Sequence, residues 1–355
     1  MGSMSDLASL QEQIRAAAGA RRPLLIRAGG SKDFYGGPLE GELLDLSGFS
    51  GISDYQPTEL VITARAGTRL IEIEGALAEH GQMLACESPQ FAGRATLGGT
   101  VAAGLSGPRR AYAGALRDFV LGLEMIDGRA ERLRFGGKVI KNVAGFDISR
   151  LMTGSLGTLG VISEVTLKSV PRPRAECTLQ FEMDQARALE SMTLWSARPL
   201  PLSATAWHDD LLCVRLSGAE AAVRAARESL GGESVSEAER YWEEVREQRL
   251  PFFTSAPELW RVSLPAHAPA LPFAGPLLIE WGGSLRWLPG PQEPRALQAL
   301  VGGLGGHAMR YRAPLKMPEG AFQSLSPALL RLHQRLKAAF DPLGIFNRGR
   351  LHPEL

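Results

Sequence analysis

The segment from residue 94 to residue 118 combines glycine and threonine with very few large side chains. Thr96, Gly98 and Gly99 stand close together near its start. So little apolar surface cannot stabilise an ordinary core strand or helix, because such elements depend on side-chain burial. Glycine permits positive φ and lets backbone N–H groups approach a ligand closely. The segment therefore predicts a backbone surface that lies against a flat ligand, and the alternative is a flexible surface loop.

A second candidate binding element is the run AGGSKD, residues 28–33, which directly follows a short apolar strand at 23–26. Consecutive small residues after a strand can form a nest of main-chain N–H groups, which binds anions and suits a pyrophosphate. The run is not a phosphate loop of the Walker type, because Ser31 separates Gly30 from Lys32.

A third glycine-rich element lies within residues 143–162, where Gly154, Gly157 and Gly160 recur at three-residue spacing. The pattern G-x-G-x-x-G occurs neither here nor elsewhere in the chain. This argues against a Rossmann dinucleotide fingerprint.

Composition excludes several classes of function. The 355 residues are 45% hydrophobic and 22% charged with a formal net charge of +1, which is typical of a globular protein without a concentrated basic surface for nucleic acid. The three cysteines, Cys86, Cys177 and Cys213, are too few and too dispersed for a disulfide framework or an iron–sulfur cluster. We find no apolar leader and no membrane-spanning stretch, and a reducing, cytoplasmic location fits best.

The elements around the glycine-rich segments indicate an α/β N-terminal region followed by an α+β unit. In the N-terminal region we expect a helix at 5–18, with Ser9 and Glu12 as a capping pair, and a second helix at 68–80, with Thr68 as N-cap. We also expect strands at 43–47 and 60–63 and a hairpin at 119–134. Pro171 and Pro173 mark the expected domain boundary. Beyond them the pattern predicts strands at 176–183, 203–217 (a hairpin), 259–264, 277–288 and 307–312, and helices at 184–197, 219–230, 294–304 and 327–340. The predicted order of strand, helix, two strands, helix and strand is that of a ferredoxin-like unit with additions.

Three glycine-rich elements in this order, together with the C-terminal Gly-Ile-Phe-Asn at 344–347, resemble the vanillyl-alcohol-oxidase (PCMH-type) FAD-binding fold. Within that fold, three segments resemble the FAD-binding E subunits of bacterial glycolate oxidases. They are residues 141–151 (KNVAGFDISRL), residues 154–160 (GSLGTLG) and the C-terminal tail. The resemblance implies an α+β protein with a two-lobed FAD-binding domain at 1–172, a ferredoxin-like α+β cap domain at 173–313, and a C-terminal segment at 314–355 that returns to the FAD domain.

The resemblance also implies a set of FAD contacts. The pyrophosphate would be held by the turn of Ala28, Gly29, Gly30, Ser31, Lys32 and Asp33. The ribityl chain and the isoalloxazine would be lined by Pro89, Thr96, Gly98 and Gly99, with Gly104 and Ser106 further along the cofactor. The nucleotide end would be clamped by Gly157, Val161 and Ile162, and Asn347 would approach the flavin from the cap side. Shaping a turn is an equal alternative for Pro89. Asp118 and Asp147 are better explained as loop and cap residues than as ligands.

Departures from related proteins qualify these expectations. Covalent members of the fold often carry histidine directly after the Gly-Gly of the phosphate turn, where this chain has Ser31, so we expect non-covalent FAD. Related single-chain hydroxy-acid dehydrogenases carry a histidine-rich metal motif in the cap, whereas the six histidines here are dispersed and predict no metal site. His208 is best explained by a hairpin turn. Arg310, Tyr311, Arg312 and Lys316 could hold a carboxylate, or could simply be solvated charges at a strand edge.

The resemblance implies an FAD-binding subunit that works with a paralogous FAD-containing D-type subunit and an iron–sulfur F-type subunit to oxidise glycolate to glyoxylate, and that contacts the inner membrane only through this complex. The sequence identifies no catalytic residue. A self-sufficient FAD-dependent dehydrogenase or oxidase of a small 2-hydroxy acid or alcohol is the first alternative, and a non-catalytic flavin-fold scaffold is the second.

Overall fold

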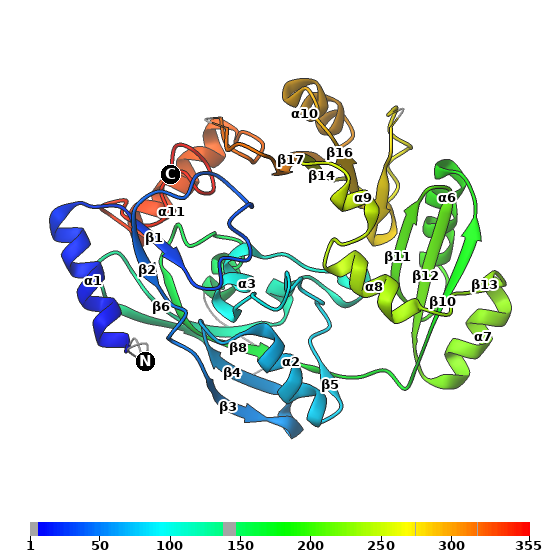
Figure 1. Ribbon diagram of the computed structural model, residues 1–355, viewed down its shortest axis with the longest axis horizontal. Coiled ribbons are helices and arrows are strands. Elements are labelled where there is room, and N and C mark those ends of the chain that lie inside the picture. The colour runs from blue at the N-terminus through cyan, green and yellow to red at the C-terminus, as the bar shows by residue number, and fades with distance from the viewer. Residues whose placement is uncertain (1–5, 138–146, 274, 318) are drawn as a thin grey trace.

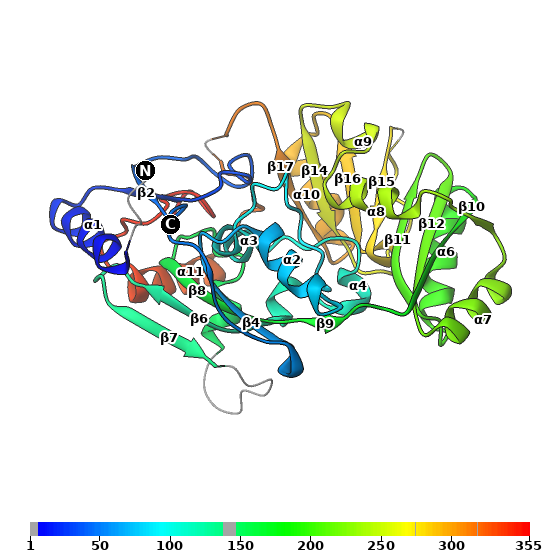
Figure 2. The same ribbon diagram turned by 60° about the horizontal axis from the view of Figure 1, so that its bottom comes forward.

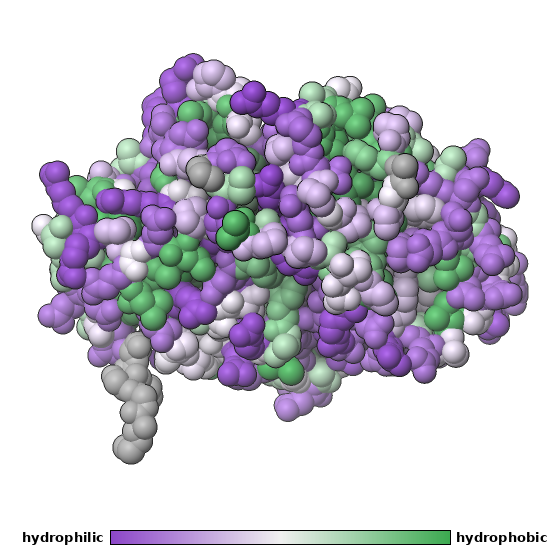
Figure 3. Space-filling view, turned by 45° about the horizontal axis from the view of Figure 1, so that its top comes forward, coloured by the Kyte–Doolittle hydropathy of each residue, from purple (hydrophilic) through white to green (hydrophobic). Residues whose placement is uncertain are grey.

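The computed structural model describes residues 6–137, 147–273, 275–317 and 319–355. Residues 141–146 of the motif at 141–151 therefore lie outside the described residues. The molecule is elongated, with α1 (Leu7–Ala20) near one end and α7 (Glu220–Leu230) near the other (Figure 1). One face, seen in Figure 3, mixes polar and apolar residues.

The N-terminal region contains two sheets in separate lobes. The first lobe is a parallel pair, β1 (Leu24–Arg27) beside β2 (Glu42–Asp45). The second is a five-stranded antiparallel sheet in the order β3-β4-β8-β6-β7, formed by β3 (Ile52–Gln56), β4 (Val61–Arg65), β8 (Val161–Lys168), β6 (Val120–Ile126) and β7 (Arg132–Gly136). The three inner strands are buried along nearly their whole length, so both faces of this sheet are covered.

Short elements connect and cover these sheets. They are α2 (Leu70–Glu79), α3 (Leu97–Ala103), α4 (Arg110–Ala113), α5 (Ile148–Met152), the 3-10 turns Pro57–Glu59 and Leu116–Asp118, and the short antiparallel pair β5 (Gln82–Met83) and β9 (Val170–Pro171). One hydrophobic core unites both lobes, from Leu10 and Ile14 of α1 through Val101 of α3 to Val165 of β8. Helix α3 therefore lies against the centre of this region rather than on its surface.

The cap, residues 175–312, is built on one eight-stranded sheet in the order β13-β10-β12-β11-β15-β16-β14-β17. Its strands are β10 (Ala175–Glu182), β11 (Leu202–His208), β12 (Leu211–Gly218), β13 (Glu233–Ser234), β14 (Leu259–Ser263), β15 (Leu278–Glu280), β16 (Leu285–Pro289) and β17 (His307–Arg312). Its helices are α6 (Gln185–Ser196), α7, α8 (Ala238–Arg246), α9 (Pro251–Thr254) and α10 (Pro294–Gly303), and a 3-10 turn occupies Trp281–Gly283. Figure 2 shows the strands side by side.

The strand order shows that the cap consists of two similar halves. The first half, β10-α6-β11-β12-α7-β13, has the strand order of a ferredoxin-like unit. The second half, β14 to β17, has the same order with α10 before its last strand, and the two halves meet where β11 pairs with β15. In place of a first helix, residues 264–277 contain four prolines, which remove helix hydrogen bonds.

The C-terminal segment returns to the N-terminal region. Helix α11 (Pro327–Phe340) packs there through Lys337, whose ammonium group donates to the carbonyls of Thr158 and Phe346 at 2.7 Å each. Phe346 then lies parallel to Leu24 of β1. The tail is thus an edge partner of the first lobe.

The structure corrects several sequence-based details. The glycine-rich segment does contain a helix, α3, because its small residues allow close packing instead of preventing helix formation. Thr68 is not the N-cap of α2, since Arg69 holds that position and the Thr68 hydroxyl bonds to the backbone of Gly51. Asp6, not Ser9, caps α1 by accepting from the Ser9 amide at 2.7 Å.

Candidate functional site

The main candidate site is a cleft in the N-terminal region with about 770 Å³ of atom-free space, counting its open mouth. Four segments that are far apart in the sequence form its walls. They are the turn after β1, helix α3, the loop before β8 and the C-terminal tail, which contribute among others Ala28, Gly29, Gly30, Ser31, Lys32, Asp33, Thr96, Gly98, Gly99, Leu156, Gly157, Ile162, Asn347 and Arg350.

The turn at 28–33 presents free backbone donors to the cleft. The amides of residues 29–32 donate to no acceptor among the residues that the structure describes. Gly30 has a φ of +63°, a conformation that glycine adopts without strain. Buried Arg350 fixes the turn from behind by donating to the carbonyls of Gly37 at 2.5 Å and Lys32 at 3.1 Å. A rigid turn with several unsatisfied N–H groups is suited to hold an anion.

Lys32 adds a positive charge to this turn. Its ammonium group is buried and lies 3.3 Å from the Ser31 hydroxyl and 3.4 Å from the Thr100 hydroxyl, without an ion pair in the described part of the chain. Burial lowers the pKa of Lys32 to about 8, and the carboxylate of Glu247 acts in the opposite direction. A buried cation without a paired carboxylate is stabilised when an anion enters beside it.

Helix α3 forms the floor of the cleft and explains its glycines. Gly98 packs so closely on Ala66, the residue after β4, that an added Cβ would lie 2.6 Å from the Ala66 Cβ. Gly99 is exposed to the cleft, where an added Cβ would meet only the Thr96 hydroxyl, at 3.2 Å. Thr96 caps the helix by accepting from the Gly99 amide. One glycine thus allows close packing inside the protein, while its neighbour keeps the cleft open.

Asn347 joins three segments at the cleft wall. Its Oδ1 accepts from the Ile26 amide at 2.8 Å, and its Nδ2 donates to the Leu156 carbonyl at 2.7 Å. The expectation that Asn347 approaches from the cap side is wrong, because the tail lies along β1. The side chain therefore holds the cleft together from within the N-terminal region.

The structure separates the sixteen predicted cofactor residues into three groups. Twelve line the cleft: Ala28, Gly29, Gly30, Ser31, Lys32, Asp33, Thr96, Gly98, Gly99, Gly157, Ile162 and Asn347. Pro89 and Ser106 line a second pocket between the N-terminal region and the cap. Gly104 ends α3 with a φ of +66° and packs on Gly154, and Val161 is fully buried in β8. Sequence reasoning missed Thr100 and Arg350, although Arg350 stands within the C-terminal tail that it singled out.

The second pocket is narrower, with about 340 Å³ of atom-free space including its mouth. Both sides of the junction contribute, and its walls include Pro89, Leu105, Ser106, Arg246, Gln248, Arg261, Glu280, Trp281, Trp287 and Tyr311. Glu280 is buried and accepts from the indole of Trp287 at 2.8 Å. Burial raises the pKa of Glu280 to about 7, while the Trp287 hydrogen bond and the charge of Arg261 lower it.

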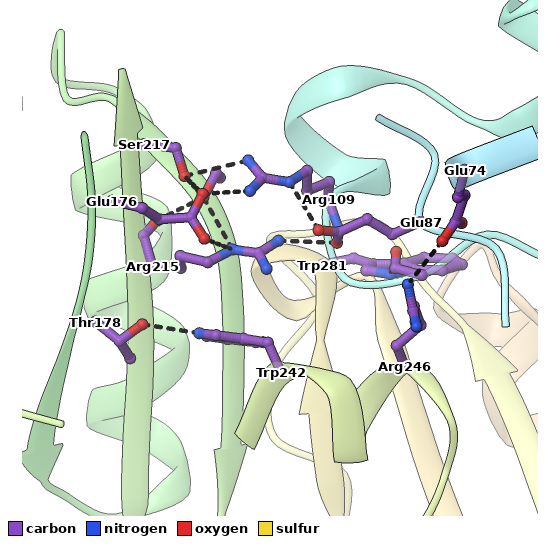
Figure 4. Close-up of polar contacts among 12 residues, drawn as sticks. Glu74, Glu87, Arg109, Glu176, Thr178, Arg215, Ser217, Trp242, Arg246 and Trp281 are labelled. Atoms are coloured by element: carbon purple, nitrogen blue, oxygen red, sulfur yellow. Dashed lines mark hydrogen bonds and ion pairs between the residues drawn. The ribbon is translucent and has the colours of Figure 1, made fainter. Parts of the chain in front are cut away.

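Beside this pocket, a charged network holds the cap to the N-terminal region (Figure 4). Glu87 accepts from Arg109 at 2.7 Å and from Arg215 of β12 at 2.8 Å. Arg109 also pairs with Glu176 of β10, which accepts from Ser217 at 2.7 Å. Both arginine side chains are buried, so the network is a fixed connection rather than a solvated surface pair.

Other predicted residues have structural partners. His208 ends β11 at the predicted hairpin turn, with its ring 3.2 Å from Asp209. Asp118 and Asp147 accept from nearby backbone amides. Arg310 pairs with Glu258 at 3.2 Å, so it does not present the free charge that a carboxylate would need. No group of three metal-ligating side chains gathers among the described residues. Within the same residues, we find no helix that is long and apolar enough to span a membrane.

The cleft fits a dinucleotide cofactor. Its donors are backbone amides, a buried ammonium group and hydroxyls, which is the chemistry that a diphosphate requires. Along the floor, Gly99 leaves room for a flat group to lie on α3.

Comparisons with known proteins agree with this chemistry. A family model described as an FAD binding domain matches residues 4–136. By fold, the chain resembles alkyldihydroxyacetonephosphate synthase with a TM-score of 0.66 and 16% identity, over 97% of this chain and 75% of that one. These matches confirm the predicted fold class, an α+β protein with an FAD-binding domain.

Sequence similarity identifies the family more closely. The chain is 48% identical to glycolate oxidase subunit GlcE of Escherichia coli (strain K12) over 347 residues, 98% of this chain and 97% of that protein. It therefore belongs to the family of glycolate oxidase E subunits, as the sequence motifs predict. Glycolate oxidase subunit GlcD of Bacillus subtilis (strain 168) is 33% identical over 186 residues, 51% of this chain and 39% of that protein. D-2-hydroxyglutarate dehydrogenase of Xanthomonas citri pv. viticola is 31% identical over 46% of this chain and 35% of that protein.

Proposed function

We propose that this chain is the FAD-binding E subunit of a multi-subunit glycolate oxidase, which converts glycolate to glyoxylate. In this proposal residues 1–172 and the tail at 314–355 bind FAD without a covalent bond, and residues 173–313 form the cap. The partners are a paralogous FAD-containing D-type subunit and an iron–sulfur F-type subunit, in a cytoplasmic complex that contacts the inner membrane peripherally. Bound FAD supplies the redox chemistry.

One observation carries the proposal. Residues 29–32 line the cleft, their amides have no acceptor in the described chain, and the Lys32 ammonium group has no ion pair there, which supports a diphosphate at that turn. Among flavoproteins with such a cleft, glycolate oxidase is favoured because the chain belongs to the family of E subunits. Ser31 stands where covalent relatives carry histidine, and this supports non-covalent binding.

Within this proposal the chain's own residues bind and orient the cofactor. The turn amides and Lys32 hold the diphosphate, while Thr96, Gly99 and Gly157 line its path. Asn347 fixes the cleft wall by its two hydrogen bonds. Burial of Lys32 strengthens its attraction for phosphate, because less water screens the charge.

A visible absorption spectrum of the purified chain tests the cofactor directly. We expect a flavin spectrum that passes entirely to the supernatant after acid precipitation. Flavin that stays with the precipitate would contradict non-covalent binding. A folded chain that neither contains flavin nor takes up added FAD, alone or with its partner subunits, would refute the proposal.

A glycine variant tests where the cofactor lies. Gly99→Leu places an apolar side chain in the cleft. We expect this side chain to weaken FAD binding by at least about 1.4 kcal/mol, which corresponds to a loss of about tenfold, and to lower the flavin content accordingly. Gly75→Leu is the matched control, because Gly75 is also an exposed helical glycine with nothing within 4 Å of an added Cβ. Equal flavin content in the two variants would contradict the assigned cleft. Gly98 is unsuitable for this test, since a side chain there collides with Ala66.

Dye reduction separates the complex from a self-sufficient enzyme. We expect glycolate-dependent reduction by the assembled subunits and much slower reduction by this chain alone. Turnover by the chain alone at the rate of the complex would favour an independent dehydrogenase.

A further inference from the structure

The second pocket lies between the face of the cap sheet that meets the N-terminal region and the end of α3. Ala103 lines the FAD cleft and Leu105, two residues later, lines the pocket, so the pocket lies where the cleft approaches the cap. From the cap, Arg261 of β14, Glu280 of β15 and Trp287 of β16 reach it from three neighbouring strands. Its small volume admits a ligand of only a few heavy atoms.

Arg261 brings to this pocket a positive charge that forms no ion pair. Its guanidinium group lies 5.1 Å from the ring centre of Trp281 and 5.9 Å from that of Trp287. It makes no hydrogen bond and no ion pair with any residue in the described part of the chain. Arg110 stacks on the same Trp281 ring at 4.4 Å and also has no carboxylate partner there, and the charge of Arg261 contributes to lowering the pKa of Arg110 after burial. Neither guanidinium group forms an ion pair with a described residue, although the charge of Asp118 acts on Arg110 and that of Arg261 acts on Glu280. An anion that reaches Arg261 would therefore gain a charge-assisted contact.

Gln248 also lines this pocket, and its side chain has a hydrogen-bond acceptor without a partner. Its Nε2 donates to the Tyr311 hydroxyl at 2.8 Å, whereas its Oε1 is buried and has no partner. The backbone next to it is fixed, because the Glu247 carboxylate accepts from the amides of Gln90 at 3.0 Å and of Phe91 at 2.6 Å. A buried carbonyl oxygen without a donor costs about 1–3 kcal/mol, so a ligand that brings a donor is favoured.

We propose that this pocket binds a small 2-hydroxy carboxylate, with its carboxylate on Arg261 and its hydroxyl donating to Oε1 of Gln248. Guanidinium groups pair with carboxylates through two parallel hydrogen bonds, and a 2-hydroxy acid carries its donor next to the carboxylate. A 2-oxo acid or a plain carboxylic acid would leave the Gln248 oxygen unpaired. The choice of glycolate as the acid rests on the proposed function, but binding itself requires neither turnover nor the partner subunits.

Calorimetric titration of the purified chain, with its flavin content recorded, tests ligand chemistry. Glycolate is compared with acetate, which lacks the hydroxyl, and with glycolamide, which lacks the charge. We expect glycolate to bind about tenfold more tightly than acetate, the cost of an unpaired buried acceptor, and glycolamide not to bind. No binding of glycolate, or equal binding of glycolate and acetate, would overturn the proposal.

Variants test the two named side chains. Arg261→Met should weaken glycolate binding about 10- to 100-fold through the loss of a charge-assisted contact, and Arg261→Lys should recover part of it. Gln248→Met should reduce the preference for glycolate over acetate to nearly none. The matched control is Arg310→Met, because Arg310 also stacks on a tryptophan, Trp260 at 5.1 Å, but is already paired with Glu258. Equal losses in Arg261→Met and Arg310→Met would overturn the assignment.

These outcomes are separable from failure of the proposed function. If the complex contains flavin and oxidises glycolate while the chain binds no acid through Arg261, only the pocket assignment fails. If the chain binds glycolate through Arg261 but contains no flavin, alone or in the complex, only the proposed function fails. Flavin absorbance and circular dichroism of each variant show whether it is folded.

Discussion

The two halves of the cap have the same strand order but use their charged residues in opposite ways. In the first half, Arg215 and Glu176 face the N-terminal region and are neutralised there by Arg109 and Glu87. In the second half, Arg261 and Glu280 face the same region without an ion pair to any described residue. The first half therefore attaches the cap, while the second half presents charge to a pocket.

This difference has a physical basis in the cost of desolvation. Burying an ion pair is roughly balanced when the pair is complete, and it fixes the geometry of the surfaces it joins. Arg261 is half-buried and has no ion pair, and its stacking on tryptophan compensates only a part of the cost of desolvation. A protein that keeps Arg261 unpaired beside a pocket gains when a ligand supplies the anion, whereas Arg215 gains nothing further.

The largest expected effect comes from exchanging these two arginines for methionine. Arg215→Met leaves Glu87 without one of its two partners in a buried network, and we expect a loss of about 3 kcal/mol in the free energy of unfolding. Arg261→Met removes stacking but no ion pair, so we expect a loss of at most about 1 kcal/mol. Urea unfolding followed by tryptophan fluorescence measures both.

The comparison would fail if the two variants lost equal stability. The exposed pair of Arg22 and Glu42 provides a baseline, because both side chains are 54% exposed. Arg22→Met should change the unfolding free energy by less than about 1 kcal/mol.

A smaller effect depends on pH and on Glu280. The folded-state pKa is raised by burial to about 7 from an ordinary value of 4.5, despite the Trp287 hydrogen bond and the charge of Arg261, while the charge of Glu87 raises it slightly further. Between these two values the unfolded chain releases a proton that the folded chain keeps, so stability falls as pH rises from about 4.5 to about 7. Glu280→Gln removes this dependence and should gain about 2–3 kcal/mol relative to the parent between pH 5 and pH 8.

Urea midpoints of variant and parent at pH 5 and pH 8 measure this gain. Exposed Glu228→Gln on α7 should follow the parent at both pH values. A constant difference between Glu280→Gln and the parent would show that Glu280 ionises normally in the folded protein.

Most of the residues that the sequence predicted for the cofactor line one cleft, because backbone builds much of it. The runs 28–33 and 96–99 contain glycines that let the backbone approach a ligand closely, so the residue types alone suggest this use. The sequence did not predict helix α3, since helix formation there depends on packing against Ala66 rather than on propensity.

The junction could not be predicted in the same way. Glu87 and Arg215 are 128 residues apart, and neither stands in a recognisable motif. The sequence predicted β10, α6, β11, β12 and α7 of the first cap half. It missed the short strand β13 and helix α8, and with α8 the position of Gln248. Whether an arginine such as Arg261 is paired depends on tertiary contacts, which a single sequence does not show.

The smallest expected effect concerns Trp281, which contacts the N-terminal region and also lines the second pocket. Its indole donates to the Gly107 carbonyl at 3.0 Å, joining the cap to the N-terminal region, and its ring carries the stacked Arg261. Trp281→Phe keeps an aromatic face but loses the hydrogen bond, so we expect a loss of about 1 kcal/mol in unfolding free energy. Because the phenyl ring still stacks on Arg261, glycolate affinity should change by less than about threefold, which corresponds to less than about 0.7 kcal/mol. Urea unfolding and calorimetric titration of the same preparation measure both quantities, and a larger effect on affinity than on stability would show that Trp281 serves the pocket more than the junction.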